Sequence, residues 1–261
     1  MTLTRPRFGL EILLVLGVSL GESAVYSILR IADRLTRPEP LAQQTTQMNT
    51  SVAADRPWLD LAYQLANIMF PLVPVLLALY LLAIAAGPVA WRGDDPSRPS
   101  WQRVGFDLRR PGRDVGWGFL VAAGIGIPGL AFYLFAREIG INTNVAPANL
   151  ADNWWTVPVY LLAAAMNGIL EEVLMLGWLY LRLRQLAWSW WLIVLTSAVV
   201  RGSYHLYQGF GGFAGNLIMG VLFGLLFLRW KRVGPLVVAH TLLDIVAFVG
   251  YALVAPRVDW L

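Results

Sequence analysis

The sequence predicts an all-α protein, a polytopic transmembrane bundle of about seven helices, with six and eight as the bounds. Of its 261 residues, 57% are hydrophobic and only 14% are charged, whereas soluble domains carry roughly 25% charged residues. Apolar stretches of about 20 residues recur, and each can cross a hydrocarbon core of about 30 Å at about 1.5 Å per residue. We therefore expect one integral membrane domain that comprises residues 1–261.

Seven apolar segments are predicted to span the membrane, and tryptophans near their ends support the boundaries, because indole rings favour the headgroup level. The segments are Phe8–Ile28, Leu61–Ala86, Gly116–Phe135, Val157–Leu181, Trp188–His205, Phe213–Phe227 and Pro235–Val254. The first follows two arginines, as a signal peptide would, but Glu11 interrupts it and no small-residue cleavage site follows, so we expect a retained helix. Glu11 and Glu22 share a face of this helix, where they could line a cavity or pair with Arg30 or Arg34, and we interpret them as structural.

Basic residues between the segments predict the orientation. Six arginines lie between the second and third segments, two follow the fourth, and three basic residues follow the sixth. Because Lys and Arg are enriched in cytoplasmic loops, we expect these loops and the N-terminus in the cytoplasm of a bacterial cell, and the C-terminus outside. The loop after the first segment carries Arg30, Arg34, Arg37 and Arg56 and disagrees with this arrangement.

Composition narrows the classes of function. The chain has no cysteine, which excludes disulfides, thiolate nucleophiles and Cys-ligated metal centres. Its net charge of +4 comes from arginines in loops between apolar segments, and not from one solvated basic face. Membrane lipid is therefore an expected partner, and nucleic acid is not. The polar stretches Arg37–Arg56 and Arg92–Asp114 are expected to be loops.

Ionisable residues inside three apolar segments form the candidate site. A charged side chain near the centre of a bilayer costs roughly 2.5–3.5 kcal/mol, so it usually faces a protein interior and marks function. The residues, in AMNGILEEVLMLGW, SAVVRGSYHLYQG and PLVVAHTLLDIV, are Glu171, Glu172, Arg201, His205, His240 and Asp244. The last four form two pairs with a spacing of four residues, so the members of each pair share a helix face.

Two kinds of chemistry fit these residue types. Adjacent helical residues point about 100° apart, so one of Glu171 and Glu172 would act while the other supports it. A desolvated carboxylate beside an imidazole can deprotonate water for attack on a carbonyl, and a second imidazole can steady the oxyanion. Alternatively, two histidines and a carboxylate can hold zinc and one water. The HExxH signature is absent, and both schemes remain open.

The three segments resemble the CAAX-protease and bacteriocin-processing family of intramembrane endopeptidases, which includes the Ras-converting enzyme. The family's motifs EExxxR, FxxxH and HxxxN or HxxxD follow one another on membrane helices. Glu171–Glu172, His205, and His240 with Asp244 match them in order, within a catalytic core of about Asn153 to Phe248. The resemblance implies an endopeptidase that cuts a membrane-associated protein or peptide, either near a C-terminus of the CAAX type or at a leader.

The resemblance also implies a role for each residue. Glu171 would activate water together with His205, and Glu172 would support them. His240 and Asp244 would hold the oxyanion or complete a metal site. A divalent metal, expected to be zinc, would have as its ligands Glu171, His205, His240 and Asp244.

Two positions depart from the motifs. The arginine of EExxxR is Leu176 here, and the aromatic residue of FxxxH is Arg201. We predict an exchange in which the supporting residue Arg201 reaches Glu172 from another helix and restores a buried ion pair. An ionised Asp244 can accept but cannot donate a hydrogen bond to an oxyanion, which favours metal ligation or a protonated carboxyl.

Non-enzymatic functions remain open as well. A proton-coupled transporter or an immunity factor would use the same buried groups as a proton relay. A degenerate family member would bind membrane peptides without cutting them. A transporter would be favoured by inverted repeats or paired broken helices, and the sequence shows neither.

Overall fold

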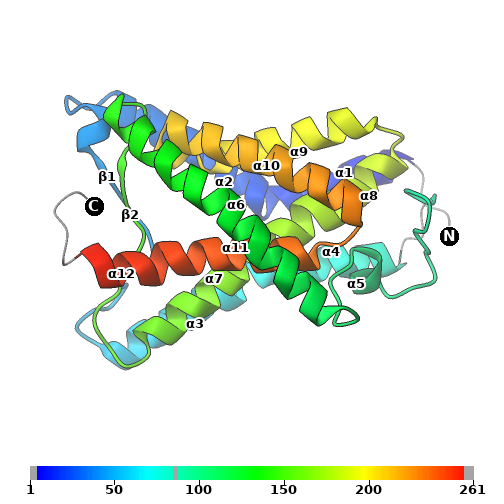
Figure 1. Cartoon of the computed structure of the whole chain (residues 1–261), viewed down its shortest axis with the longest axis horizontal. Helices are drawn as coiled ribbons and strands as arrows, with labels where there is room; N and C mark the ends of the chain where they lie inside the picture. The colour runs from blue at the N-terminus through cyan, green and yellow to red at the C-terminus, as the bar shows by residue number, and fades with distance from the viewer. Residues whose placement is uncertain (1–4, 85–87, 256–261) are drawn as a thin grey trace.

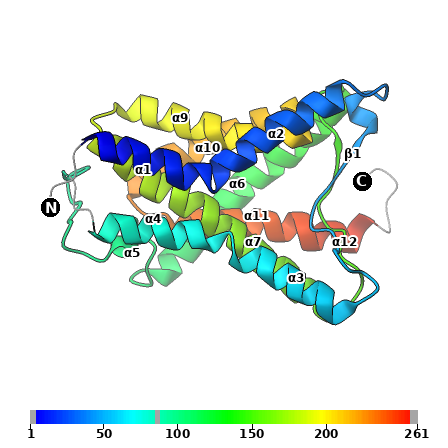
Figure 2. The same ribbon diagram turned by 180° about the vertical axis from the view of Figure 1, so that it is seen from behind.

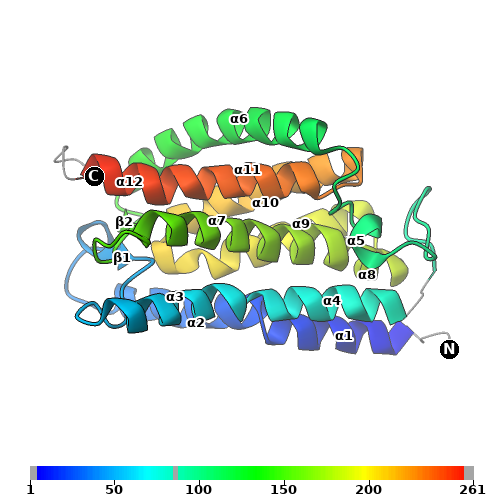
Figure 3. The ribbon, with the colours of Figure 1, turned by 90° about the horizontal axis from the view of Figure 1, so that it is seen from below.

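Packed helices form almost the whole structure (Figure 1). The computed structural model describes residues 5–84 and 88–255. Figure 3 shows the helices in layers: α6 (Pro111–Glu138) is outermost on one side, and α7 (Thr156–Glu172) lies in the middle. Helix α7 packs against α11 (Gly234–Ile245) on one side and α4 (Leu72–Ile84) on the other. The predicted all-α membrane bundle is confirmed.

Within residues 5–84 and 88–255, five continuous helical stretches are long and apolar enough to cross a membrane. Two are single helices, α6 and α10, and the other three are built from shorter helices that follow one another without a sharp bend. The stretches are Pro57–Ile84 (α3, Pro57–Met69, and α4), Pro111–Glu138 (α6), Thr156–Gln185 (α7, η2, Val173–Trp178, and α8, Leu179–Gln185), Phe210–Trp230 (α10) and Gly234–Val254 (α11, η4, Val246–Gly250, and α12, Tyr251–Val254).

The predicted count of seven spans is not confirmed. The first predicted span is two helices, α1 (Arg5–Gly17) and α2 (Leu20–Leu35), bent by 54°, and it is a sixth span only if the pair is counted as one. Helix α9 (Trp190–Tyr204) has 15 residues and is about 22 Å long, shorter than a hydrocarbon core of about 30 Å. The end of the predicted span Leu61–Ala86 lies outside the described residues.

A small sheet joins two loops at one end of the bundle (Figure 2). Strands β1 (Thr45–Gln47) and β2 (Asn144–Ala146) pair in parallel, so the stretch from Arg37 to Arg56, predicted to be loop, includes a strand and the 3-10 turn η1 (Leu41–Gln43). The sheet continues to the loop after α9, where the Thr143 amide donates to the Gln208 carbonyl at 2.8 Å.

Gly209 makes this junction possible. Its φ is +119° and an added Cβ would lie 2.6 Å from the Ile141 carbonyl oxygen, a combination that only glycine accommodates. The 3-10 turn η3 (Leu206–Gln208) is thereby held against the segment before β2. His205 directly precedes this turn, so the sheet fixes the backbone on which that imidazole is carried.

A buried ion pair joins the first helix to the centre of the bundle. Glu11 Oε1 accepts hydrogen bonds from Arg182 Nε at 2.6 Å and from Trp178 Nε1 at 3.3 Å. Arg182 also donates to the Leu81 carbonyl at 2.9 Å. The interpretation of Glu11 as structural fits these contacts, but its partner is Arg182 and not Arg30 or Arg34, which lie about five and six helical turns further along the chain in α2.

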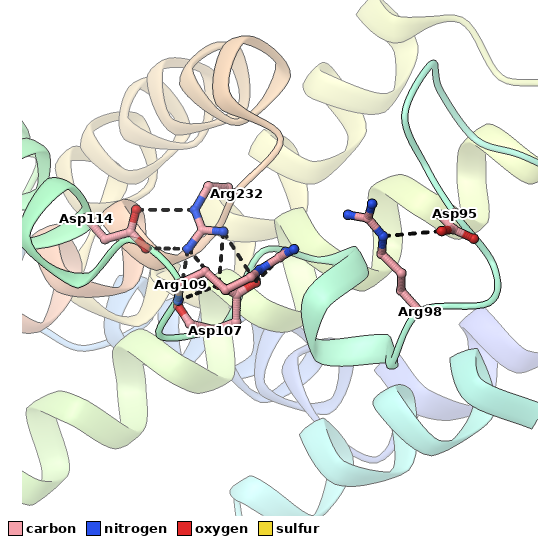
Figure 4. A network of polar contacts seen from close by, with 6 residues as sticks. All are labelled: Asp95, Arg98, Asp107, Arg109, Asp114 and Arg232. Carbon is pink, nitrogen blue, oxygen red and sulfur yellow. Dashed lines mark hydrogen bonds and ion pairs between the residues drawn. The ribbon is translucent and has the colours of Figure 1, made fainter.

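A second charged cluster locks the turn between α10 and α11 to the beginning of α6 (Figure 4). The Arg232 guanidinium donates to Asp114 Oδ2 at 2.6 Å and to Asp107 Oδ1 at 3.1 Å. Arg109 donates to the other oxygen of Asp107 at 2.7 Å. The side chains of Asp107 and Asp114 are buried. Loss of the arginine partner would therefore leave buried charges that water solvates poorly.

We expect this cluster to make the stability of the fold depend on pH in the acidic range. Burial by itself raises the pKa of Asp107, but hydrogen bonds from Arg109 and Arg232 outweigh it and hold the pKa well below its usual value. The ion pairs of Asp107 therefore contribute fully to the free energy of unfolding above the unfolded-state pKa of about 4. This contribution is lost as pH falls below that value. Melting temperatures of wild type and Asp107→Asn should differ at pH 7 and converge toward pH 3.

Asp95→Asn is the matched control for this experiment. Asp95 and its partner Arg98 lie in the same loop region but are exposed (Figure 4), and an exposed pair contributes only about 0–1 kcal/mol. A gap between wild type and Asp107→Asn that stayed constant from pH 7 to pH 3 would contradict the assignment.

Candidate active site

Three helices bring the six predicted ionisable residues into one region of the core. Glu171 and Glu172 end α7, Arg201 lies in the last turn of α9, and His205 caps that helix. His240 and Asp244 lie on α11. Because α11 packs on α7, and α9 crosses the π-helical continuation of α7, all three pairs face the same interior volume.

Gly168 sets the close approach of two of these helices. A Cβ at this position would lie 2.6 Å from Thr241 Oγ1 and 3.0 Å from the Val237 carbonyl, so a larger residue would push α11 away from α7. Thr241 is the residue after His240. The glycine three residues before Glu171 therefore allows the carboxylates of α7 to reach the imidazole of α11.

Glu172 is the buried anchor of the site. Its Oε1 lies 2.5 Å from Arg201 Nη2 and 2.7 Å from His240 Nδ1, and its side chain is completely inaccessible. The ion pair between Arg201 and Glu172 that the two motif departures suggested is thus present. Since Leu176 cannot supply a cation from α7's own continuation, Arg201 supplies it from α9.

Arg201 lies between both carboxylates. Its Nη1 is 3.8 Å from Glu171 Oε2, and its guanidinium carbon is 5.5 Å above the ring of Phe223. One buried cation therefore faces two adjacent acids, and the aromatic face beneath it adds a favourable cation–π contact. This pairing explains how two neighbouring glutamates are tolerated inside an apolar bundle.

Glu171 and His205 form a second part of the site, and both are less buried than Glu172 and Arg201. Glu171 Oε2 accepts a hydrogen bond from the Tyr204 hydroxyl at 2.6 Å and lies 3.9 Å from His205 Nε2. The second distance is too long for a hydrogen bond, and neither ring nitrogen of His205 has a hydrogen-bond partner among the described residues. The carboxylate and the imidazole can therefore both contact one small molecule, such as water.

His240 and Asp244 complete the site from α11. Asp244 Oδ1 is 3.8 Å from His240 Nε2, and Asp244 Oδ2 accepts a hydrogen bond from Asn167 Nδ2 at 2.8 Å. Asn167 is four residues before Glu171, so both project from one face of α7. The amide thereby holds Asp244 in place beside the imidazole.

Asn167 and Tyr204 were not predicted as site residues. Both carried a usable signal: Asn167 is a polar residue inside an apolar helix, one turn before Glu171, and Tyr204 directly precedes His205. Neither fits a motif position, and only the geometry shows that they contact Asp244 and Glu171.

Two π-helical turns flank the site, and neither was predicted. Segment η2 follows Glu172 directly, and η4 begins two residues after Asp244. Such turns insert about one extra residue into a helix and occur frequently at functional sites. Here η2 turns the residues that follow Glu172 into the buried core, where all six are inaccessible.

The predicted metal-ligand set does not gather around one point. Among the described residues, Glu171, Glu172 and His240 have donor atoms within 4.8 Å of one another, and neither His205 nor Asp244 belongs to that group. Arg201 already occupies the position between the two carboxylates, and a divalent ion about 2.0–2.2 Å from their oxygens would lie beside its fixed positive charge. The four predicted ligands therefore do not form one group, and an ion held by Glu171, Glu172 and His240 would lie beside the guanidinium of Arg201.

Comparison with known proteins agrees with the site. Residues 153–246 match the family model of type II CAAX prenyl endopeptidases, Rce1-like. This segment is therefore Rce1-like. The Rce1-like segment contains all six predicted site residues, while the N-terminal helices lie outside the match. No curated protein and no solved structure was found to match the chain.

The Rce1-like match supports a peptidase function in an integral membrane protein. The family is one of proteases, and such a protease acts on a membrane-associated peptide or protein. The apolar helices that surround the segment agree with this setting.

Proposed function

We propose that the protein is an intramembrane endopeptidase of the CAAX-processing type, which hydrolyses a peptide bond near the end of a membrane-associated protein or peptide. The observation that carries the proposal is the pair formed by Glu171 and His205, a carboxylate and an open imidazole 3.9 Å apart within the Rce1-like segment. A water molecule between them would contact a base and a second hydrogen-bonding group at once.

In the proposed reaction, Glu171 removes a proton from a water molecule that His205 positions. The water oxygen attacks the substrate carbonyl carbon, and a tetrahedral oxyanion forms. Glu171 then delivers the proton to the amide nitrogen, the carbon–nitrogen bond breaks, and a new carboxylic acid and a free amine leave. Because the site is buried, the exchange of protons takes place in a medium of low dielectric, where fixed charges act strongly.

The remaining residues would position these groups. His240 is held at Nδ1 by Glu172, and a proton on its Nε2 would be donated to the oxyanion. Asp244, fixed by Asn167, lies beside that nitrogen. Arg201 would keep Glu172 ionised and oriented, and Tyr204 would aim the Glu171 carboxylate through its hydroxyl.

We further propose that the chain forms one domain in a bacterial cell membrane, with its N-terminus in the cytoplasm, and that lipid but not nucleic acid is its other partner. The support is the excess of basic residues in the loops after α4, α8 and α10. In two of these loops a basic residue is already paired with a carboxylate, Arg103 with Asp94 and Arg232 with Asp114.

The decisive assay is cleavage of a membrane-anchored peptide library, which includes peptides with a prenylated C-terminus, by the purified protein in liposomes. We expect wild type to cut, and His205→Ala to lose about 10²–10⁴-fold in rate. Ser203→Ala is the control, because its hydroxyl bonds only to the Val199 carbonyl of its own helix, and it should cut normally.

We expect a strong zinc chelator to leave the rate unchanged, because the guanidinium of Arg201 already pairs with Glu172 and lies 3.8 Å from Glu171. Inhibition that zinc reverses would overturn the metal-free scheme while keeping the peptidase. Absence of cleavage by folded wild-type protein would overturn the peptidase and favour a binding or transport function.

A further inference from the structure

Two cations and two indoles gather where α10 ends. Lys231 caps α10 in the left-handed conformation, with φ 54° and ψ 35°, although this position in a helix cap is usually taken by glycine. Its Nζ lies 4.4 Å from the ring centroid of Trp190 and 5.0 Å from that of Trp91. The two indoles pack against each other with centroids 6.2 Å apart.

A second cation shares one of these rings. The guanidinium carbon of Arg184 lies 4.9 Å from the ring centroid of Trp190. Arg184 donates to the carbonyls of Ala90 and Trp188, and no carboxylate forms an ion pair with Arg184 or Lys231 in the described part of the chain. Burial, together with the charge of Arg184, lowers the pKa of Lys231. Two positive groups thus converge, and no described residue supplies a negative partner.

An apolar groove adjoins the ammonium. It encloses about 360 Å³ between α9 and α10, and the outward face of both helices here is apolar and exposed, Trp191 and Leu225 included. The residues that line it are Trp190, Trp191, Val194, Leu225, Leu228 and Lys231.

We propose that this cluster binds one anionic phospholipid, with its phosphate at Lys231 and one acyl chain in the groove. The charge is complementary, since a phosphate would accept hydrogen bonds from the ammonium and neutralise two neighbouring cations. Both helices expose apolar side chains beside the groove, a face that would meet lipid in a membrane, so the molecule that fills the groove would come from the bilayer. A free phosphate would leave the apolar part empty.

The conformation of Lys231 favours a role in ligand binding over a role only in capping α10. A lysine in the left-handed region is strained relative to glycine, and the indoles on both sides hold its ammonium at the mouth of the groove. Tryptophan rings favour the headgroup level of a bilayer, the depth at which lipid phosphates lie. The cluster is separate from the six residues of the candidate active site.

The test is retention of lipid by the purified full-length protein, measured by native mass spectrometry after equilibration with vesicles of phosphatidylglycerol or of phosphatidylcholine. Wild type should retain one phosphatidylglycerol with at least about a tenfold preference, a difference of about 1.4 kcal/mol. Lys231→Gly should lose this preference while melting at the same or a higher temperature, because glycine adopts the cap conformation without strain.

Two further variants complete the design. Lys231→Arg keeps the positive charge and should keep the preference, and the control Arg229→Gln, which removes an exposed cation two residues earlier, should keep it as well. Equal retention of both lipids by wild type, or a preference that survives in Lys231→Gly, would overturn the proposal. Inorganic phosphate alone that raised the melting temperature as much as phosphatidylglycerol does would also overturn it, because the ligand would then not be a lipid.

Discussion

Replacing Glu171 with glutamine is expected to lower kcat by about 10²–10⁴-fold, the usual contribution of a general base. The amide has nearly the same shape and still accepts the hydrogen bond from Tyr204, which lies 2.6 Å from the carboxylate. It cannot take a proton from water, however. KM should change little, because the substitution removes proton transfer and leaves the surface that meets the substrate almost unaltered. Initial rates in liposomes over a range of peptide concentrations would separate kcat from KM.

Glu22→Gln is the matched control for this variant. Glu22 is an acid of α2 whose side chain is exposed on the outer face of the bundle, so its replacement should leave both constants unchanged. If Glu171→Gln kept more than about a tenth of the wild-type kcat, Glu171 would not be the base, and another group would have to be sought.

Replacing Arg201 with leucine is expected to destabilise the protein by about 3–5 kcal/mol, the usual effect of removing one partner from a buried ion pair. The variant leaves the Glu172 carboxylate, which is completely buried, with only His240 as a charged neighbour in contact. Cleavage should fall as well, because Glu172 orients His240. Denaturant unfolding in detergent would give the loss of stability, and activity measured well below the melting temperature would show the loss of function separately.

The motif departures provide a sharper test of the same pair. Arg201→Phe with Leu176→Arg restores an arginine on the helix of Glu172 and an aromatic residue on α9. We expect this double variant to be more stable than Arg201→Phe alone, since the cation returns to the same carboxylate from its own helix. If the double variant is destabilised by the sum of the effects of the two single substitutions, position 176 cannot reach Glu172. The exchange explanation of the departures would then be wrong.

The sequence predicted the residues of the site better than their surroundings. Ionisable groups in apolar helices are costly unless they meet one another, so Glu171, Glu172 and His240 could be expected to converge. The pairing of Arg201 with Glu172 followed from two compensating departures, Leu176 and Arg201 itself. Contacts such as those of Asn167 and Tyr204 have no motif position, and they depend on helix rotation that periodicity in a fully apolar helix does not define.

Some features of the fold could not be predicted from the sequence for similar reasons. The apolar run of α1 and α2 gives no sign of a 54° bend, and the Trp188–His205 segment is apolar enough to suggest a span although its helix has only 15 residues. The strands β1 and β2 have three residues each and pair across a separation of about a hundred residues. Such short, distant pairings leave no alternating pattern in the sequence.

The π-turn η2 changes the rotation of side chains about the axis between the two parts of one long helical stretch. On its N-terminal side, α7 aims Glu172 at α9 and α11, and on its C-terminal side α8 aims Arg182 at Glu11 of the first helix. A regular helix would relate the two directions by the number of residues between them, at about 100° for each. The extra residue of the π-turn removes this constraint. Glu172 can therefore face its partners on α9 and α11 while Arg182 faces Glu11. Shortening the turn by one residue would therefore misdirect one end without breaking the helix.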